Sequence, residues 1–337
     1  MKRRGLPLNS FQGFIDPDLT SGIRLAGTDI WLDPRKKRPL AFISHAHSDH
    51  LGSSHETVIT SLKTAALTAS TLRAHTVRAV NWHEKVELGG AKVELFPAGH
   101  ILGSAQIMIE KDGLRIVYTG DIKVTASFTA ERIEIRKCDV LIIECTYGHP
   151  KFLFPDRHEV AHDLIKFVKD CMAKRITPVI VAYRVGKAQE VVKILGDAGI
   201  RTRLEHSIYE VTRLYTELGV SLLNYRRYPP FTPHREAIVV PPHRLSLVRP
   251  IVRKRIALVT GWALDKEKIS RFEHDVAIPL SDHADFAELL SYVMIARPKK
   301  VYTVHGDEEF SKQLRREGFD ATHLDTPFVQ PTLWGYI

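Results

Sequence analysis

The feature that most constrains this chain is the stretch 44–50, which reads SHAHSDH and directly follows the apolar run 40–43. The apolar run predicts a buried strand that ends at the motif. Because side chains alternate along extended backbone, His45 and His47 point the same way, and the following turn can bring Asp49 and His50 to a neighbouring ion. These four potential ligands exceed what one ion with an open position needs, whereas two adjacent ions can use them.

Other potential ligands follow other predicted strands. His100, Asp121 and His305 each come directly after a strand and beside a glycine that permits a tight turn. His283 lies in SDHADF, just before a predicted helix at 286–296. Each position is a weak signal alone, but strand ends can converge on one edge of a sandwich of sheets. Imidazole and carboxylate ligands suit Zn and tolerate Mn, so we expect a site for two such divalent ions.

The order of predicted elements indicates an α/β protein. Strands dominate up to residue 155: the chain shows a helical pattern only at 62–75, and glycine turns predict hairpins over 85–96 and 105–118. After residue 155, strands and helices alternate, which predicts a small unit with a parallel sheet. Within that unit, 224–250 is expected to be irregular apart from a short strand at 237–240.

The basic charge of the chain is concentrated in one block. The chain has a formal net charge of +9, and residues 156–268 contain 21 Lys and Arg against 12 Asp and Glu, so this block carries the whole excess. Such asymmetry favours a polyanionic partner held against a separate basic lobe. A solvated basic face that serves solubility is the alternative.

Composition also bears on the compartment. No apolar run approaches the length of a membrane span, and the first residues lack the apolar segment of a signal peptide. Cys138, Cys145 and Cys171 form no CxxC pair and lie in apolar surroundings. We therefore expect buried free thiols in a cytoplasmic protein that has no membrane partner.

Taken in order, these motifs resemble a known family. HAHSDH, PAGHILGSAQ and YTGDIK resemble the metallo-β-lactamase superfamily, and Glu144 in IIECTYG, LSDHADF and TVHGD resemble its β-CASP branch, which processes nucleic acids. The resemblance covers most of the chain. It implies an αββα metallo-β-lactamase sandwich from residues 1–155 and 269–337, with a small α/β (β-CASP) domain inserted at 156–268. The plan is most similar to bacterial DNA exonucleases associated with ATP-dependent ligases, which implies a DNA ligase or helicase of a repair system as a possible partner.

The resemblance also implies a ligand set. His45, His47 and His100 would hold one ion, whereas Asp49, His50 and His305 would hold the other. Asp121 would bridge the two ions. A water between the ions would lose a proton near neutral pH and attack the phosphodiester.

Two further residues match the catalytic acids of the branch. His283 would contact the scissile phosphate or protonate the leaving oxygen, and Glu144 would keep it charged and oriented. Asp49, His283 and Glu144 are thus the expected catalytic residues. We expect Asp282 and Asp285 to cap the helix that follows.

Basic residues of the block are candidates for contacts with nucleic acid. Arg184 and Lys187 flank a glycine at a strand-to-helix turn, where backbone amides can bind phosphate. Two further clusters mix cations with aromatic residues or prolines, as single-strand binders do; they are Arg226 and Arg227, and Arg253, Lys254 and Arg255.

The leading hypothesis is a metal-dependent DNA exonuclease of DNA repair. An RNA-processing nuclease is the nearest alternative, because the position of His305 is histidine in RNA-processing relatives and typically valine in Artemis-type DNA enzymes. A small-substrate hydrolase of the same superfamily would need neither the basic block nor Glu144 and His283. A binding protein with an inactive site is disfavoured by the intact ligand set.

Overall fold

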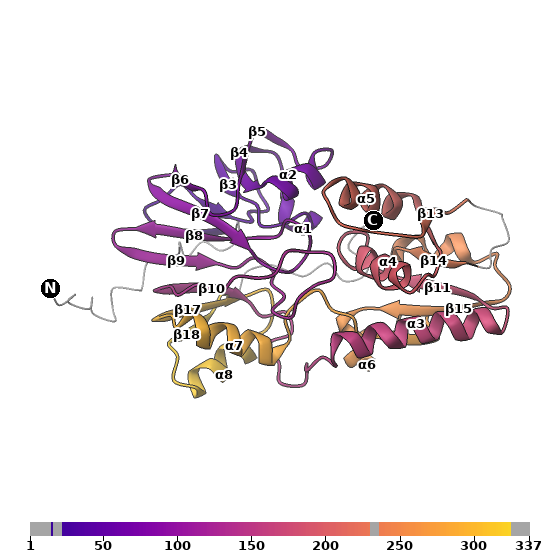
Figure 1. The fold of residues 1–337 in the computed structure, drawn as a ribbon. Helices are drawn as coiled ribbons and strands as arrows, with labels where there is room; N and C mark the ends of the chain where they lie inside the picture. The colour runs from indigo at the N-terminus through magenta and orange to yellow at the C-terminus, as the bar shows by residue number, and fades with distance from the viewer. Residues whose placement is uncertain (1–14, 16–21, 230–235, 325–337) are drawn as a thin grey trace.

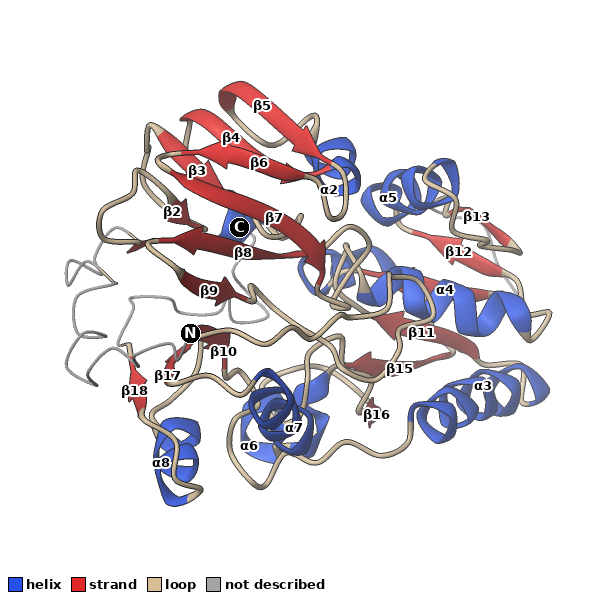
Figure 2. Cartoon of the chain, turned by 60° about the vertical axis from the view of Figure 1, so that its left-hand side comes forward, coloured by secondary structure: helices blue, strands red, loops and turns tan. Residues whose placement is uncertain are grey.

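The computed structural model describes residues 15, 22–229 and 236–324 and places their strands in three sheets (Figure 1). Two sheets face each other, and the third forms a separate lobe from the middle of the chain (Figure 2). The predicted α/β class, a metallo-β-lactamase sandwich with a small α/β unit inserted, is confirmed.

The first sheet comes from the N-terminal part of the chain. Its order is β1-β2-β3-β4-β5, and only the β1–β2 pair is antiparallel. The strands are β1 (Ile23–Arg24), β2 (Trp31–Leu32), β3 (Leu40–Phe42), β4 (His55–Ser61) and β5 (Ala74–Val80). The helices between them are α1 (Ser48–Leu51) and α2 (Leu62–Thr68). All three residues of β3 are buried, which explains its continuous apolar sequence.

The second sheet has the order β18-β17-β10-β9-β8-β7-β6. Neighbouring strands from β18 to β9 are parallel, and those from β9 to β6 are antiparallel. Its strands are β6 (Lys85–Leu88), β7 (Ala91–Pro97), β8 (Ala105–Lys111), β9 (Leu114–Tyr118), β10 (Val140–Glu144), β17 (Lys300–Val304) and β18 (Ala321–His323). Both predicted hairpins are present. Their turns place Gly89-Gly90 and Asp112-Gly113 at positive φ, as two-residue hairpin loops require.

The main core lies between these two sheets. Its buried side chains include Phe42, Ile59, Leu95, Ile107 and Tyr118. Helices α7 (Phe286–Ala296) and α8 (Glu309–Arg316) cover the outer face of the second sheet, where they bury Tyr292 and Phe310. The sandwich therefore holds its strand ends in fixed positions along one edge.

The third sheet forms what we call the middle lobe, together with the helices around it. All its neighbouring strands are parallel, in the order β13-β12-β14-β11-β15-β16. The strands are β11 (Thr177–Val181), β12 (Thr202–Leu204), β13 (Tyr225–Arg227), β14 (Ala237–Val240), β15 (Lys254–Val259) and β16 (Val276–Ile278). β16 belongs to this sheet although it lies beyond residue 268, the predicted end of the inserted domain. The boundaries of the inserted domain stay a prediction.

Helices cover both faces of this sheet. One face packs against α3 (Arg157–Ala173), α4 (Lys187–Asp197) and α5 (His206–Glu217). The other face packs against the short helices η2 (Pro242–Val248), η3 (Gly261–Leu264) and α6 (Lys266–Ile269). Because the strands are parallel, their carboxyl ends share one edge, and that edge faces the sandwich (Figure 1).

Two buried ion pairs involve the first turn of α4, and their residues link the middle lobe to the stretch before α7. Lys187 Nζ lies 2.6 Å from Asp282 Oδ1, and both side chains are buried. Glu190 pairs with Arg157, whose Nη1 also donates to the carbonyl oxygen of Ser281 over 3.0 Å. These contacts fix the stretch before α7 against the middle lobe.

The structure corrects two predicted elements. The helix expected at 62–75 ends at Thr68, because residues from Ala74 onward pair with β4. β13 is a strand within a segment expected to be irregular, because it pairs with β12. In both places strand pairing, which no local pattern records, decides the structure.

Two further predictions concern the cysteines and membrane-spanning segments. The three cysteines are buried free thiols, as predicted. None of the helices in the described part of the chain is both long and apolar enough to cross a membrane.

Candidate metal centre

Strand ends bring the predicted ligands to one edge of the sandwich. His45 and His47 follow β3, His100 follows β7, Asp121 follows β9, and His305 follows β17. Close backbone approach makes glycine necessary at some of these ends. A Cβ on Gly306, for example, would lie 2.1 Å from the carbonyl oxygen of Cys145.

The first histidine group consists of His45, His47 and His100 with Asp121. One ligand atom from each lies within 4.8 Å of the others. His47 Nδ1 is 3.0 Å from His45 Nε2 and 3.2 Å from His100 Nε2. Three of the four residues are buried, and they have the composition that zinc prefers, with nitrogen ligands and one carboxylate.

The opposite nitrogen of each ring has a fixed acceptor. His47 Nε2 donates to the carbonyl oxygen of Val185 over 3.1 Å, and His100 Nδ1 donates to that of Asp282 over 2.8 Å. His45 Nδ1 lies 2.9 Å from the Ser44 hydroxyl, which itself donates to a carboxylate and so must accept from the ring. The lone pairs of all three neutral rings therefore point at one another, an arrangement that a cation between them would stabilise.

The second histidine group consists of His50 and His305 with the same Asp121. His305 Nδ1 is 3.2 Å from Asp121 Oδ1, and His50 Nε2 is 3.4 Å from Asp121 Oδ2. Burial would raise the pKa of Asp121, but the neighbouring His50 and His283 hold it well below its usual range. This carboxylate is thus an anion shared by both groups.

Asp33 supports the second group, and the sequence did not identify it. Its carboxylate is buried and accepts from the Ser44 backbone N–H, the Ser44 hydroxyl, His50 Nδ1 and the Tyr118 hydroxyl over 2.6–2.8 Å. The bond to His50 Nδ1 leaves Nε2 directed at Asp121. The only local signal was an acid placed before Pro34 at the end of β2.

Asp49 lies beside the two histidine groups. It belongs to neither histidine group as the side chains lie among the described residues. Its carboxylate is 3.7 Å from His50 Nε2, its side chain is 16% exposed, and it lines the adjoining cavity. The predicted ligand role of Asp49 stays a prediction, and the structure places its carboxylate beside the second group.

His283 and Glu144 form the predicted pair. His283 Nδ1 lies 3.1 Å from both carboxylate oxygens of Glu144, which is fully buried at the end of β10. Burial would lower the pKa of His283, but Glu144 and Asp121 outweigh burial and raise that pKa to about 9. The other ring nitrogen, Nε2, is 3.9 Å from Asp121 Oδ2. The neighbouring carboxylates of Glu144 and Asp121 thus favour the charged form of the ring.

Comparison with known families matches two parts of the chain. Residues 30–179 match the family described as the beta-lactamase superfamily domain, and residues 276–326 match the Zn-dependent metallo-hydrolase RNA specificity domain. The first match spans both histidine groups apart from His305, and the second spans His283 and His305. The chain belongs to the β-CASP branch of the metallo-β-lactamase superfamily. This branch consists of metal-dependent hydrolases, and the geometry above fits that chemistry.

Three relatives show how the similarity is distributed. The chain is 34% identical to a probable DNA ligase of Opitutus terrae, over 91% of this chain and 31% of the ligase. It is 24% identical to DNA ligase 6 of Arabidopsis thaliana, over 86% of this chain and 23% of that protein. It is 26% identical to an RNase J-like protein of Methanocaldococcus jannaschii, over 79% of this chain and 80% of the relative. The chain thus spans a third or less of the two ligases.

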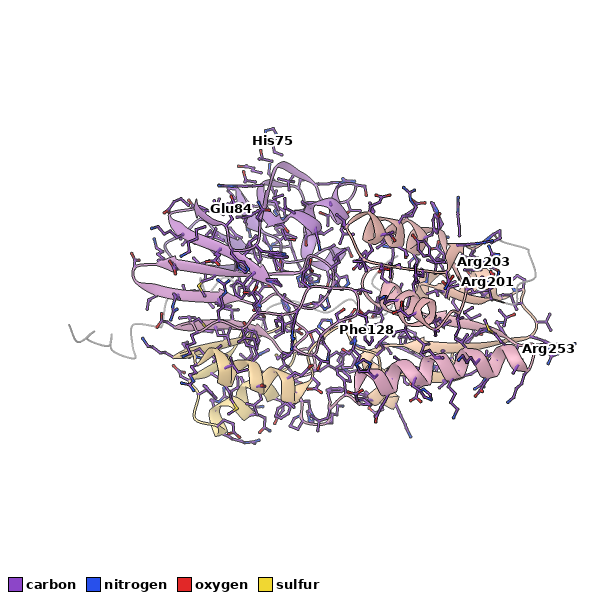
Figure 3. The ribbon with its side chains drawn as sticks, in the orientation of Figure 1. His75, Glu84, Phe128, Arg201, Arg203 and Arg253 are labelled. Atoms are coloured by element: carbon purple, nitrogen blue, oxygen red, sulfur yellow. The ribbon has the colours of Figure 1, made fainter. Side chains whose placement is uncertain are left out.

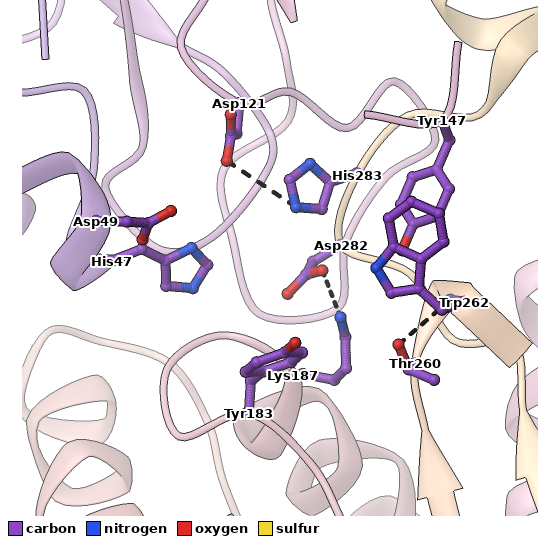
Figure 4. Close-up of a pocket in the computed structure, with 10 residues that line it drawn as sticks. All are labelled: His47, Asp49, Asp121, Tyr147, Tyr183, Lys187, Thr260, Trp262, Asp282 and His283. Atoms are coloured by element: carbon purple, nitrogen blue, oxygen red, sulfur yellow. Dashed lines mark hydrogen bonds and ion pairs between the residues drawn. The ribbon is translucent and has the colours of Figure 1, made fainter. Parts of the chain in front are cut away.

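The metal centre of this β-CASP protein opens into what we call the metal cavity, of about 520 Å³ (Figure 4). His47, Asp49 and Asp121 line one side, and His283 stands between them and the aromatic residues Tyr147 and Trp262. The middle lobe closes the cavity from below in this view. It supplies Tyr183, Lys187, Thr260 and Trp262.

The structure corrects the roles expected for two charged residues. Lys187, expected to contact phosphate, is held in the buried ion pair with Asp282, although both line the metal cavity. Asp282 does not cap α7; Asp285 does, and it accepts from the Glu288 backbone N–H over 2.9 Å. The sequence could not reveal this pair, because its members lie 95 residues apart.

The other predicted nucleic-acid contacts are spread over the middle lobe. Arg184 follows β11 and lies near the metal centre, where it lines a second cavity with His47. Arg226 and Arg227 are exposed on β13, at the edge of the sheet. Arg253, Lys254 and Arg255 lie at the amino end of β15, and Figure 3 shows Arg253 at the far tip of the lobe. The structure thus does not bring these last three residues together with the metal centre.

Proposed function

We propose that this protein is a metal-dependent phosphodiesterase that removes nucleotides from the end of a DNA strand during repair. The observation that carries the proposal is the position of His283. A protonated imidazole, fixed by Glu144, faces the carboxylate shared by two histidine groups across a single cavity. A proton donor opposite a metal centre is what phosphodiester hydrolysis requires.

The reaction breaks one P–O bond of the backbone and forms another between phosphorus and the oxygen of water. Two divalent ions, Zn or Mn, fit the two histidine groups and when bound would promote deprotonation of the water and neutralise phosphate charge. The leaving oxygen needs a proton, and His283 Nε2 can supply it because Nδ1 is occupied by Glu144. Glu144 holds the ring in place and favours its charged form.

Supporting residues also have defined tasks. Asp33, Ser44 and the carbonyl oxygens of Val185 and Asp282 orient the imidazoles from behind. Asp49 lies beside the second group with an exposed edge and can receive the proton that the attacking water loses. Tyr147 and Trp262 line the metal cavity beside His283.

The basic middle lobe favours a polyanionic substrate, DNA or RNA. DNA is the first candidate because two relatives that align with most of this chain are named DNA ligases. A DNA ligase, or a helicase of the same repair system, is therefore the partner we propose. RNA is the second candidate, because the RNase J-like relative matches over most of both chains and His305 sits in the centre.

The test uses purified protein with end-labelled single- and double-stranded DNA and RNA, labelled at either end, with Mn or Zn. Degradation of DNA from one end, with RNA left intact, is the expected result. Asp49→Ala should remove most of this activity, whereas Asp320→Ala, which changes a half-exposed acid paired with Lys300, should not. Equal cleavage by the wild-type and Asp49→Ala proteins would contradict the scheme, and faster cleavage of RNA would favour the second candidate.

The role of His283 can be separated from metal binding. His283→Ala should keep its metal, measured by elemental analysis, and lose most of its turnover. His283 also lies within ligand distance of His100 and Asp282, and of Asp121 and Glu144. A variant that loses metal would therefore place His283 among the ligands instead.

A further inference from the structure

A large cavity in the middle lobe lies outside the metal centre. This outer cavity encloses about 800 Å³, part of it open to solvent, and lies against the face of the sheet that carries Val181 and Leu258, which pair with each other near the carboxyl ends of β11 and β15. Helix η2 and residues 271–273 form its other walls. The cavity thus lies between one face of the sheet and the helix that covers it, close to the carboxyl ends of the strands, beside which ligands characteristically bind in open parallel sheets.

A third cavity lies between the outer cavity and the metal cavity and shares lining residues with each of them. This linking cavity of about 470 Å³ shares His47 and Tyr183 with the metal cavity. The same linking cavity shares Pro242 and His243 with the outer cavity. The three cavities thus adjoin one another in series, from the metal centre outward. A flexible polymer bound at the metal centre can continue along this path.

Arginines without acidic partners line the path. Arg184 borders the linking cavity, and Arg249 and Arg271 border the outer cavity. Within the described part of the chain, no salt bridge involves any of these three side chains, whereas Arg157, Arg203 and Arg213 in the same lobe each pair with a glutamate. One acid, Glu273, also lines the outer cavity. Unpaired guanidinium groups in a hollow are suited to phosphate.

The outer cavity also offers apolar surface for a base. Phe272 and Leu245 line it, and Arg271 Cζ lies 5.5 Å from the ring centroid of Phe272. Aromatic side chains next to arginines are the combination on which single-stranded nucleic acids stack, with little preference for sequence. A small apolar ligand would need no guanidinium groups, and an inorganic anion would need no apolar wall.

Resting on the proposed function, we infer that the outer cavity is a remote nucleotide subsite. It holds one nucleotide of the same single strand whose terminal phosphodiester lies at the metal centre. The base contacts Phe272 and Leu245, and a backbone phosphate lies between Arg249 and Arg271. The linking cavity, with Arg184, carries the strand between the two sites. Oligonucleotides long enough to reach the outer cavity therefore bind more tightly than shorter ones.

The test measures binding without turnover. Labelled oligothymidylates of two to ten nucleotides are titrated against the metal-loaded His283→Ala protein by fluorescence anisotropy. Affinity should rise with length and then level off. Replacing Arg249 and Arg271 together by alanine should weaken binding of the longest oligonucleotide about tenfold, leave the shortest within about twofold, and reduce the salt dependence by one to two charges. Phe272→Leu should give a smaller loss for long strands only.

Arg253→Ala is the matched control, because it removes an exposed arginine at the opposite end of β15. Equal weakening of short and long strands, or equal weakening by Arg253→Ala, would overturn the subsite in favour of a general charge effect. The proposed function can fail separately from the subsite. If the protein binds long strands through Arg249 and Arg271 but cuts no substrate, the subsite is supported and the nuclease function is contradicted. If it cuts strands but binds all lengths equally, only the subsite is contradicted. Absence of any binding overturns both.

Discussion

The two histidine groups share Asp121 but are held from behind by different chemistry. In the first group the acceptors are neutral: the Ser44 hydroxyl and two backbone carbonyl oxygens. In the second, His50 donates to the buried carboxylate of Asp33. Burial lowers the pKa of His100 to about 3, whereas Asp121 and Asp33 outweigh burial and raise the pKa of His50 well above its usual range.

This difference shows where each group is vulnerable. The first group depends on three separate acceptors, two of which belong to the backbone and survive any single side-chain substitution. In the second group, His50 depends on one buried anion, Asp33, that also binds Ser44 and Tyr118. Substitutions should therefore weaken metal binding by the two groups unequally. Four substitutions are given below in order of decreasing expected effect.

Asp121→Ala should have the largest effect, because this carboxylate belongs to both groups. We expect loss of metal from both groups and a fall in activity of more than about a hundredfold, beyond the range found for residues that only support a ligand. Elemental analysis and nuclease assays measure the two effects. Retention of two ions per chain would show that the groups do not share Asp121.

His305→Val should damage only the second group. The first group keeps all its side chains, so we expect one ion per chain to remain while activity falls about a hundredfold. His75→Val, an exposed change on β5 at the far edge of the first sheet, is the control (Figure 3). Loss of both ions from His305→Val would mean that the groups assemble as one unit.

Asp33→Asn should weaken the second group without removing a ligand. The amide keeps the volume of the carboxylate but not its charge, and its NH₂ group faces donors. We expect metal affinity of the second group to fall about tenfold, together with a loss of roughly 1–3 kcal/mol in the free energy of unfolding. Competition with a chelator and urea unfolding measure these changes. An equal loss of affinity at the first group would contradict the distinction drawn between them.

Ser44→Ala should have the smallest effect of the four. It removes a neutral acceptor from His45 and one of several donors to Asp33. The expected loss is about 1 kcal/mol of stability and a few-fold change in metal affinity, measured in the same two assays. An effect larger than that of Asp33→Asn would show that the hydroxyl, rather than the buried charge, organises the site.

Predictability from the sequence depended on whether a residue lies in a recognisable local pattern. His45, His47, His100, Asp121 and His305 could be predicted because each follows an apolar run whose end is visible locally. The supporting bonds to Asp33 could not, because His50 and Tyr118 lie 17 and 85 residues away from it. The geometry of Asp49 depends on the turn into α1, which a ligand motif does not specify.

The position of the basic residues within the middle lobe was also only partly predictable from the sequence. The charge asymmetry indicated a basic lobe but not which of its edges faces the metal centre. Arg253 precedes the apolar run of β15, whereas Arg184 follows that of β11. In a parallel sheet these positions lie at opposite ends, so the order of charge and strand was the signal that could have separated them.

The hydrogen bond from His47 to the carbonyl oxygen of Val185 crosses from the sandwich to the middle lobe. Binding of a metal ion by His47 would therefore be coupled to the packing of the middle lobe. By reciprocity, any free energy that the lobe contributes to metal affinity would equally stabilise the docked lobe when the ion is bound. Metal binding at His47 would then contribute to the stability of the protein as well as to its chemistry.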